Sequence, residues 1–387
     1  MKVATIVGAR PQFIKAAAVS KELRKVVREV LIHTGQHYDF TMSDIFFDEL
    51  KIPRPDYNLG IGSGSHGSQT GKMLELIEKV LIKENPDCVL VYGDTNSTLA
   101  GALTAAKLQI PLAHVEAGLR SFNSIMPEEI NRKVTDHVSS ILFCPTVIAV
   151  KNLRQEGFDN VINRGVLVNE GSSHLDLGLK QPVVLNVGDV MYDVLKSTLN
   201  VSNSIPSDLL AKYPITSNNY ILATIHRAEN ADNMENMVNI MKVLSKIPLK
   251  VIIPLHPRTY DRILKFSLYE EMQQSRNIIL TDPLGYIEMM FLLNNARCVV
   301  TDSGGLQKEA CMLGIPCLTC RYETEWLETV EYGWNSLIGL GAVNFDGLPE
   351  RKKINRESNP YGDGFAACRI TQIIKGYLKH HERAVAF

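Results

Sequence analysis

Residues 88–115 read CVLVYGDTNSTLAGALTAAKLQIPLAHV, and this stretch decides the fold. It begins with an uninterrupted apolar run, residues 88–92, and ends with a second one, residues 112–115. Strands that are buried on both faces of a parallel sheet have such runs, without polar alternation. The segment between them, residues 97–108, has a helical pattern. The stretch therefore predicts a strand–helix–strand unit with parallel strands.

The same alternation occurs in two sets along the chain. The first set has strand candidates at residues 3–7, 30–34, 88–92, 112–115 and 141–144, and helical patterns at residues 11–26, 68–83, 97–108 and 128–139. The second has strands at residues 220–224, 250–253, 278–280, 298–301 and 317–318, and helices at residues 234–246, 286–294 and 306–313. Two such sets predict an α/β protein with two Rossmann-like domains of parallel sheets, which face a central cleft lined by loops at the carboxyl ends of the strands.

The boundary between the sets is marked by irregular sequence. Residues 164–181 are glycine-containing and aperiodic, and residues 166–184 resemble an insertion between domains. We place the hinge near residues 186–188 and expect a helix at residues 365–378 to pack on the first domain. The predicted N-terminal domain is residues 1–185 with the C-terminal helix 365–381, and the C-terminal domain is residues 186–364.

The composition is that of an ordinary soluble globular protein of 387 residues, 45% hydrophobic and 21% charged. A net charge of −1 and a pI near 6.8 predict neither a nucleic-acid partner nor a membrane-surface partner. The first apolar run is broken by Gly8 and Pro11, so we expect no signal peptide, and no run has membrane-spanning length. Seven cysteines, an odd number, predict reduced thiols in a cytoplasmic protein.

Acidic side chains lie beside arginines in two neighbouring segments, HVEAGLR at residues 114–120 and PEEINR at residues 127–132. Carboxylates in different surroundings, such as Glu116 and Glu128, can supply the acid and the base for chemistry on an anionic substrate. The alternative is structural, with Glu128 and Glu129 interacting with a helix dipole. Asp94 follows the strand at residues 88–92 and is either a further acid/base group or an ordinary helix N-cap.

Candidate anion-binding groups follow several strands. They are Arg10 and Lys15 after the first strand, His226 and Arg227 after the strand at residues 220–224, and, as a weaker candidate, His256. Cations at a strand-to-helix turn suit a phosphate or diphosphate, because the N–H groups of the helix start also point there. The alternatives are solvated surface side chains and, for His226, a buried core histidine.

A glycine-containing turn predicts a further anion site. The strand at residues 298–301 is followed by Ser303, Gly304 and Gly305 at the start of a helix, which leaves N–H groups directed at an anion. Glu309 lies on the first turns of that helix and could accept ribose hydroxyl groups. The alternative is a structural turn in which Ser303 is only the N-cap.

Three other patterns predict no cofactor or metal. Residues 62–67 spell GxGxxG but follow no apolar strand, so we expect no NAD. Residues 67–72 are one residue short of a P-loop. Cys317 and Cys320 form a CxxC pattern without a second pair, which indicates core thiols and no zinc site.

Taken in order, the motifs resemble those of the non-hydrolysing UDP-N-acetylglucosamine 2-epimerase family. The matching segments are Gly8–Pro11 with Lys15, Gly93–Thr95, His114–Arg120, Pro127–Arg132, His226–Arg227, Asp302–Gln307 and Asn359–Gly364. The resemblance implies a GT-B-like fold with the nucleotide bound mainly by the second domain, no metal, no NAD and a homodimer. It also implies removal of the C2 proton, anti elimination of UDP to 2-acetamidoglucal, and re-addition.

The resemblance also assigns roles to residues. Asp94, Glu116, Glu128 and His226 match catalytic positions, and the order of acid and base among the carboxylates stays open. Substrate-binding positions are matched by Arg10, Lys15, Arg132, Arg227, His256, Ser303, Gly304, Gly305, Glu309 and Arg321.

The substrate sugar has an alternative. Where the common family pattern reads RDTTERPE, this chain reads RYETEWLE at residues 321–328, with Trp326 in place of an arginine. This resembles the branch that acts on UDP-2,3-diacetamido-2,3-dideoxyglucuronate. UDP-N-acetylglucosamine remains our first expectation. A GT-B glycosyltransferase that uses a UDP-sugar donor and a catalytically silent UDP-sugar sensor are the alternatives from other functional classes.

Overall fold

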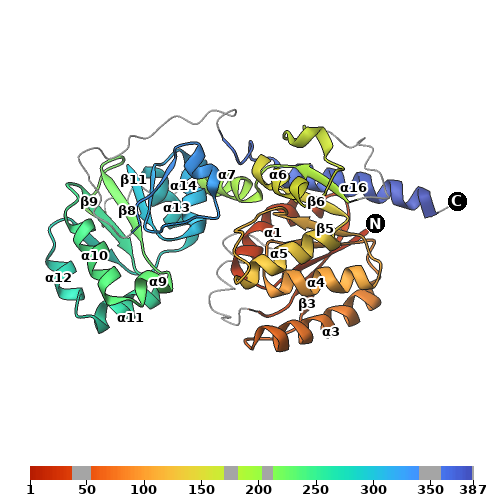
Figure 1. Cartoon of the computed structure of the whole chain (residues 1–387), viewed down its shortest axis with the longest axis horizontal. Helices are drawn as coiled ribbons and strands as arrows, with labels where there is room; N and C mark the ends of the chain where they lie inside the picture. The colour runs from red at the N-terminus through yellow and green to blue at the C-terminus, as the bar shows by residue number, and fades with distance from the viewer. Residues whose placement is uncertain (37–53, 170–181, 203–211, 340–358, 386–387) are drawn as a thin grey trace. The chain divides into compact units, whose positions relative to one another are not determined.

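The computed structural model describes residues 1–36, 54–169, 182–202, 212–339 and 359–385 (Figure 1). The chain forms two compact units. Unit 1 comprises Met1–Val194 and Pro360–Phe387, and unit 2 comprises Leu195–Asn359. Each unit contains one sheet in which the paired strands are parallel, so the predicted α/β class is confirmed.

The sheet of unit 1 has seven strands among the described residues, in the order β3-β2-β1-β4-β5-β6-β7. The strands are β1 (Lys2–Val7), β2 (Arg28–His33), β3 (Tyr57–Asn58), β4 (Cys88–Tyr92), β5 (Leu112–Val115), β6 (Ile141–Cys144) and β7 (Val183–Asn186). The helical elements are α1 (Arg10–Leu23), α3 (His66–Glu84), α4 (Asn96–Lys107), α5 (Pro127–Val138), α6 (Val147–Gln155), the 3-10 helix η1 (Ile162–Gly165), α7 (Val190–Ser202) and α16 (Ala366–Val385).

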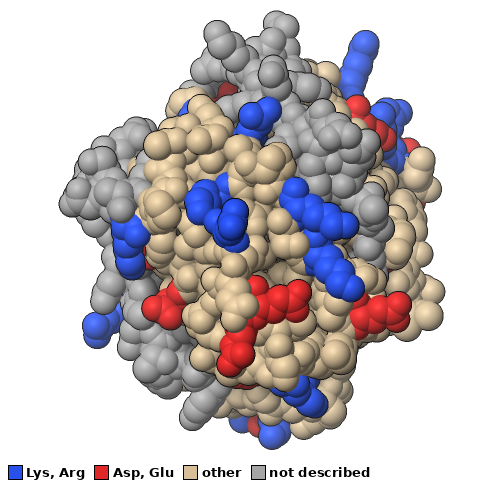
Figure 2. All heavy atoms as spheres, turned by 90° about the vertical axis from the view of Figure 1, so that its left-hand side faces the viewer, with Lys and Arg blue, Asp and Glu red and all other residues tan. Residues whose placement is uncertain are grey.

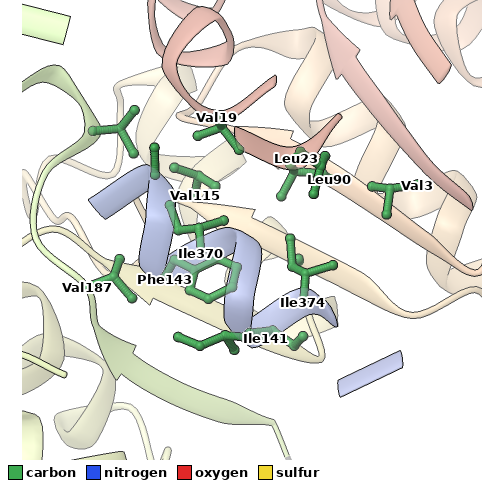
Figure 3. Close-up of a cluster of buried hydrophobic side chains, with 14 of the residues drawn as sticks. Val3, Val19, Leu23, Leu90, Val115, Ile141, Phe143, Val187, Ile370 and Ile374 are labelled. Carbon is green, nitrogen blue, oxygen red and sulfur yellow. The ribbon is translucent and has the colours of Figure 1, made fainter. Parts of the chain in front are cut away.

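Helices cover both faces of this sheet, which explains why its central strands β1, β4, β5 and β6 are mainly apolar. In β1, Val3 and Val7 point into the core formed with α1 and α16. Ala4 and Ile6 point to the opposite face, where α3 and α4 pack. Figure 3 shows Ile370 and Ile374 of α16 beside side chains of the sheet, so the C-terminal helix completes the core of unit 1.

The chain leaves unit 1 later than the sequence pattern predicts. The expected boundary follows residue 185, whereas the compact units divide between Val194 and Leu195, inside α7. The physical reason is packing, because Val187 and Val190 belong to the core of unit 1. Asp193 also accepts hydrogen bonds from the N–H groups of Ala366 (3.1 Å) and Ala367 (2.7 Å), which ties α7 to the start of α16.

The sheet of unit 2 has six strands among the described residues, in the order β10-β9-β8-β11-β12-β13. They are β8 (Tyr220–Thr224), β9 (Lys250–Pro254), β10 (Ile278–Thr281), β11 (Cys298–Thr301), β12 (Cys317–Thr319) and β13 (Asn335–Leu337). The helices are α9 (Ala228–Ala231), α10 (Met234–Ser245), α11 (Pro257–Lys265), α12 (Tyr269–Gln274), α13 (Tyr286–Asn295), α14 (Gly304–Leu313) and α15 (Leu327–Glu331). In Figure 1, α10 and α11 lie on one side of this sheet and α13 and α14 on the other.

Several elements were not predicted. Among the strands these are β3, β7 and β13, which are short or partly polar. Among the helices they are α6, α7, α9, α11, α12 and α15. The predicted end of the insertion at residues 166–184 is wrong, because Val183 and Val184 belong to β7 and pair with β6. Residues 170–181 lie outside the described residues.

The surface carries charges of both signs. Figure 2 shows basic and acidic side chains on the same face, separated by residues of other kinds. None of the helices formed by the described residues is long and apolar enough to cross a membrane.

Candidate active site

The strand order places candidate residues at the switch point of each sheet. In unit 1 the connections leave β1 and β4 in opposite directions, and in unit 2 the same holds for β8 and β11. Ligands of open α/β sheets bind at this point, outside the carboxyl ends of the strands. Asp94 follows β4, and Glu116 follows the adjacent β5. His226 follows β8, and Ser303 follows β11.

Asp94 is not the N-cap of the following helix. Thr95 caps α4, because its side chain accepts the N–H of Thr98 at 3.4 Å. The partly buried Asp94 carboxylate instead accepts a 2.5 Å hydrogen bond from Nη1 of Arg132. Burial raises the pKa of Asp94, and the charges of Glu116 and Glu128 add to this shift, whereas Arg132 and Lys15 oppose it. Asp94 therefore holds a proton more readily than an ordinary aspartate.

Glu116 lies in a different environment from Asp94. Its carboxylate forms an ion pair with Nζ of Lys15, and both side chains are only 10% exposed. Glu116 has a positive φ of 74°, a conformation that costs energy for a non-glycine residue and that turns it out of β5. Gly93 makes the approach possible, because a Cβ at this position would lie 3.3 Å from Oε2 of Glu116. The structure thus brings Lys15, Asp94 and Glu116 together.

The adjacent glutamates at the start of α5 have opposite surroundings. Glu129 is fully buried and accepts hydrogen bonds from Arg132 Nη2 (2.8 Å), Ser121 N (2.9 Å) and Phe122 N (3.2 Å). Burial opposes its ionisation, but the Ser121 N–H and Arg132 lower the pKa of Glu129. Glu128 forms no hydrogen bond or ion pair within the described part of the chain, and it lies in the first turn of α5, where the helix dipole favours a carboxylate. Glu129 is therefore structural, and Glu128 is available to a ligand.

A buried polar network beneath these carboxylates was missed by sequence analysis. His114 contacts Asp136 of α5, Asp136 contacts Arg120, and Arg120 contacts Glu156 after α6. His114 and Arg120 were visible in the motif at residues 114–120. For Asp136 the sequence contained only a weaker indication of a site residue, namely its spacing: it lies one helical turn after Arg132 and therefore on the same face of α5.

Arg10 begins α1, but its side chain lies outside the described residues.

A buried aspartate organises the candidate site of unit 2. Asp302 is fully buried, and its carboxylate accepts the N–H groups of His226 (3.0 Å) and Arg227 (3.0 Å) and the side-chain amide of Asn230 (3.0 Å). These bonds hold the turn after β8 against the end of β11. The His226 ring, which is 38% exposed, stacks on His256 with 5.6 Å between ring centroids. His226 is therefore not a buried core residue.

The groups that the sequence predicts to bind an anion lie at the start of α14, and we call Ser303, Gly304, Arg227 and Arg321 the anion cradle. Ser303 is the N-cap, and its hydroxyl accepts the N–H of Leu306 at 3.4 Å, while Gly304 and Gly305 open the helix. The Glu325 carboxylate lies at this helix start, since a Cβ on Gly304 would be 2.1 Å from its Oε1. Glu325 also pairs with Arg321 (2.9 Å) and Arg227 (3.5 Å). A carboxylate thus lies where the sequence predicts an anion.

Two further candidates of unit 2 have defined partners. Glu309 on α14 is buried, and its Oε1 accepts the hydroxyl of Tyr286 at 3.1 Å. His256 caps α11, because its Nδ1 accepts the N–H of Arg258 at 3.2 Å. A hydrogen bond in this direction uses the lone pair of Nδ1.

The two units offer complementary chemistry. Unit 1 presents Asp94, whose pKa is raised, close to Glu116, which is paired with Lys15, and this arrangement suits proton transfer. Unit 2 presents N–H groups, a histidine and arginines, which suit a diphosphate. No group of three or more histidine, cysteine or carboxylate side chains among the described residues could hold a metal ion.

Comparison with known proteins gives consistent matches over nearly the whole chain. A family profile described as UDP-N-acetylglucosamine 2-epimerase matches residues 21–375. A Methanococcus maripaludis protein named UDP-N-acetylglucosamine 2-epimerase homolog is 51% identical, over 97% of this chain and 99% of its own length. The UDP-2,3-diacetamido-2,3-dideoxy-D-glucuronate 2-epimerase of Pseudomonas aeruginosa is 47% identical, with the same coverage. The crystal structure of Methanocaldococcus jannaschii UDP-GlcNAc 2-epimerase in complex with UDP-GlcNAc and UDP is 42% identical, covers 97% of this chain and 99% of that one, and has a TM-score of 0.78.

Proposed function

The chain belongs to the UDP-N-acetylglucosamine 2-epimerase family, and we propose that it interconverts UDP-N-acetylglucosamine and UDP-N-acetylmannosamine. The observation that carries this proposal is the pair of contrasting carboxylates at the carboxyl edge of the unit 1 sheet. The pKa of Asp94 is raised, mainly by burial, while Glu116 is paired with the Lys15 ammonium. Such a pair suits an enzyme that must remove a proton from one face of a sugar carbon and return it to the other.

The reaction couples proton loss to departure of an anion. A carboxylate removes the C2 proton, the C–H electron pair forms the C1=C2 double bond of 2-acetamidoglucal, and the bond between C1 and the diphosphate oxygen breaks. UDP leaves with that electron pair. In the second half, the diphosphate oxygen adds back to C1 and a carboxylic acid protonates C2 from the opposite face. The C2 proton is weakly acidic, so the leaving UDP must be stabilised as its charge develops.

Each unit contributes residues to a different part of this reaction. Asp94, Glu116 and Glu128 are the proton-transfer groups, with Lys15 and Arg132 setting the charge around the first two. His226, Arg227 and Arg321 meet the diphosphate, together with the helix start at Ser303, Gly304 and Gly305. We assign Arg10 and His256 to the residues that meet the diphosphate as well. Glu309 accepts ribose hydroxyls. The homodimer and the cytoplasmic compartment remain predictions.

The same reaction on UDP-2,3-diacetamido-2,3-dideoxyglucuronate is the second candidate, and Trp326 favours it. Trp326 is 7% exposed, and its ring lies 4.3 Å from Nζ of the buried Lys308. It also borders the anion cradle, since its Nε1 would lie 3.4 Å from a Cβ on Gly304. The common family pattern has an arginine at this position, so the side chain beside the helix start differs from that pattern.

Proton NMR in D₂O tests the function and the sugar together. With UDP-N-acetylglucosamine we expect deuterium at C2 and a manno-configured product. A faster reaction with the diacetamido-glucuronate would reverse the order of the two candidate sugars. No exchange with either sugar, despite UDP binding, would contradict the proposal and favour a glycosyltransferase or a sensor.

Glu309→Ala is expected to weaken UDP binding by roughly ten- to a hundredfold, the scale of a lost hydrogen bond to a charged group. Isothermal titration calorimetry with UDP measures this change. Tyr286→Phe is the matched control, because it removes one hydrogen bond to Glu309 but keeps the carboxylate, and it should have a smaller effect. Unchanged UDP affinity in Glu309→Ala would exclude the ribose role.

Glu325→Gln is expected to tighten UDP binding by roughly two- to fivefold, the scale of one partly exposed ion pair. Burial opposes ionisation of Glu325, but Arg321 and Arg227 lower its pKa, so a diphosphate must displace a carboxylate from these arginines. Glu323→Gln removes the same charge from an exposed position two residues away and serves as the control. Equal UDP affinities for the two variants would show that Glu325 does not compete with the nucleotide.

A further inference from the structure

His114 bridges two elements of the unit 1 site. It lies on β5, is fully buried, and precedes Glu116 by two residues. Its Nε2 lies 2.7 Å from the carbonyl oxygen of Gly93, the residue before Asp94, and its Nδ1 lies 2.7 Å from Oδ1 of Asp136 on α5. One ring therefore joins the turn after β4 to helix α5.

Asp136 extends this connection to the loop after β5. Its Oδ2 accepts the N–H of Gly118 (3.1 Å) and Nη1 of Arg120 (2.7 Å). Arg120 in turn forms a bidentate pair with Glu156, at 2.7 and 2.6 Å. Because Asp136 shares α5 with Glu128, the network reaches the elements of all three candidate proton-transfer carboxylates.

Both partners of the His114 ring are oxygen atoms fixed by the fold. The carbonyl oxygen of Gly93 can only accept a hydrogen bond. Burial opposes ionisation of Asp136, but His114 and Arg120 lower its pKa. The ring and the Arg120 guanidinium thus both contact the Asp136 carboxylate, which joins β5, the loop after it and α5.

We infer that His114 is a positioning residue for proton transfer, which fixes the Gly93–Asp94 turn, the loop that carries Glu116, and helix α5 relative to one another. This inference rests on the proposed function. It needs no contact between His114 and the substrate, because a displacement of about 1 Å in a catalytic group can lower a rate by about a hundredfold. Its effect is expected in kcat, while substrate and UDP binding are retained.

Three variants separate positioning from general support of the fold. His114→Ala removes both bonds, and His114→Gln supplies an amide that can still donate to the Gly93 carbonyl. Asp136→Asn can donate to Nδ1 while its oxygen accepts from Gly118 and Arg120, which keeps His114 in place. Glu29→Gln is the control, because Glu29 is a buried carboxylate bonded to Thr5, Ser20 and Arg24, near the amino end of β2.

The measurements are kcat and KM for UDP-N-acetylglucosamine, C2 deuterium exchange, UDP affinity by calorimetry, and folding by circular dichroism. We expect His114→Ala to lower kcat and C2 exchange by roughly ten- to a hundredfold, with KM and UDP affinity within about twofold. His114→Gln and Asp136→Asn should recover most of this loss. The Glu29→Gln variant should have the wild-type kcat when it is assayed below its own unfolding temperature.

Two results would overturn the inference. One is a wild-type kcat in His114→Ala, and the other is a loss that neither His114→Gln nor Asp136→Asn reduces. If His114→Ala does not fold, the inference is tested by comparing the kcat values of His114→Gln and Asp136→Asn with the kcat of Glu29→Gln. Absence of C2 exchange in the wild-type protein would instead contradict the proposed function, so the two failures are distinguishable.

Discussion

Asp94→Asn, Glu116→Gln and Glu128→Gln are each expected to lower kcat by roughly 10²–10⁴-fold, the upper scale for loss of an acid/base group. Each amide keeps the shape of the side chain but can neither take nor return a proton at neutral pH. UDP binding should persist, because none of the three carboxylates is among the groups proposed to meet the diphosphate, and apart from Arg10 those groups belong to unit 2. The measurement is kcat by NMR with UDP-N-acetylglucosamine, together with UDP affinity by calorimetry.

Two controls define the specificity of this effect. Glu75→Gln changes an exposed glutamate that pairs with Lys79 on α3, and it should retain both activity and binding. Glu129→Gln alters the buried neighbour of Glu128 and should act mainly on stability. A wild-type kcat in any of the three carboxylate variants would remove that residue from proton transfer.

The direction of the reaction distinguishes base from acid. The group that removes the C2 proton from the gluco sugar returns a proton in the reverse reaction, so its role changes with the substrate. Initial rates of C2 proton loss in D₂O should therefore be measured from both sugars for each variant. A carboxylate whose replacement slows proton loss more from one sugar than from the other is the base for that sugar.

Arg132→Met is expected to destabilise unit 1 by about 3–5 kcal/mol, the scale for breaking a buried ion pair by removing one partner. Arg132 and Glu129 have side chains that are 8% and 1% exposed. Loss of the guanidinium leaves the buried Glu129 carboxylate with its hydrogen bonds from Ser121 and Phe122, and with Lys133 at 3.9 Å. Chemical denaturation at pH 7 measures the loss, and Glu129→Gln/Arg132→Met should recover part of it.

The pH dependence of Arg132→Met provides a second measurement. The folded-state pKa of Glu129 is lowered, so its ionised form stabilises the wild type at neutral pH, and this contribution is lost as the pH falls through the folded-state pKa. The stability difference between wild type and Arg132→Met should therefore narrow in acid. In Arg132→Met, Asp94 also loses a cation that lowers its pKa, so its pKa should rise further. The part of the pH profile of kcat that depends on Asp94 should therefore move to higher pH. A stability within about 1 kcal/mol of wild type at pH 7 would contradict the assigned pair.

The strands at the centre of both sheets could be predicted from sequence because both of their faces are buried. The predicted bounds at residues 88–92, 112–115, 141–144, 220–224 and 298–301 agree with β4, β5, β6, β8 and β11. Edge strands carry less signal. β13 has the short, partly polar sequence NSL, and β3 has only two residues. The boundary of unit 1 was misplaced because packing of Val190, and not local composition, keeps the first part of α7 in that unit.

The candidate site could be predicted only as a set of positions. Motif order located Asp94, Glu116 and Glu128, but their environments come from partners distant in sequence, such as Arg132 for Asp94 and Lys15 for Glu116. The family resemblance selected Glu128, but the residues alone did not show that Glu129 is buried and paired with Arg132, because that depends on the face of α5 that packs in the fold. The bridging role of His114 could not be predicted from the sequence either, because its partners Gly93 and Asp136 are far away along the chain.

The most direct test follows oxygen-18 placed between C1 and the β-phosphorus of UDP-N-acetylglucosamine, incubated with the protein in D₂O. Departure and re-addition of UDP should move the label from the bridging to the non-bridging positions of the β-phosphate. The same molecules should carry deuterium at C2 and include the manno-configured sugar. A manno-configured product that keeps the bridging label in place would contradict the elimination of UDP on which the account rests.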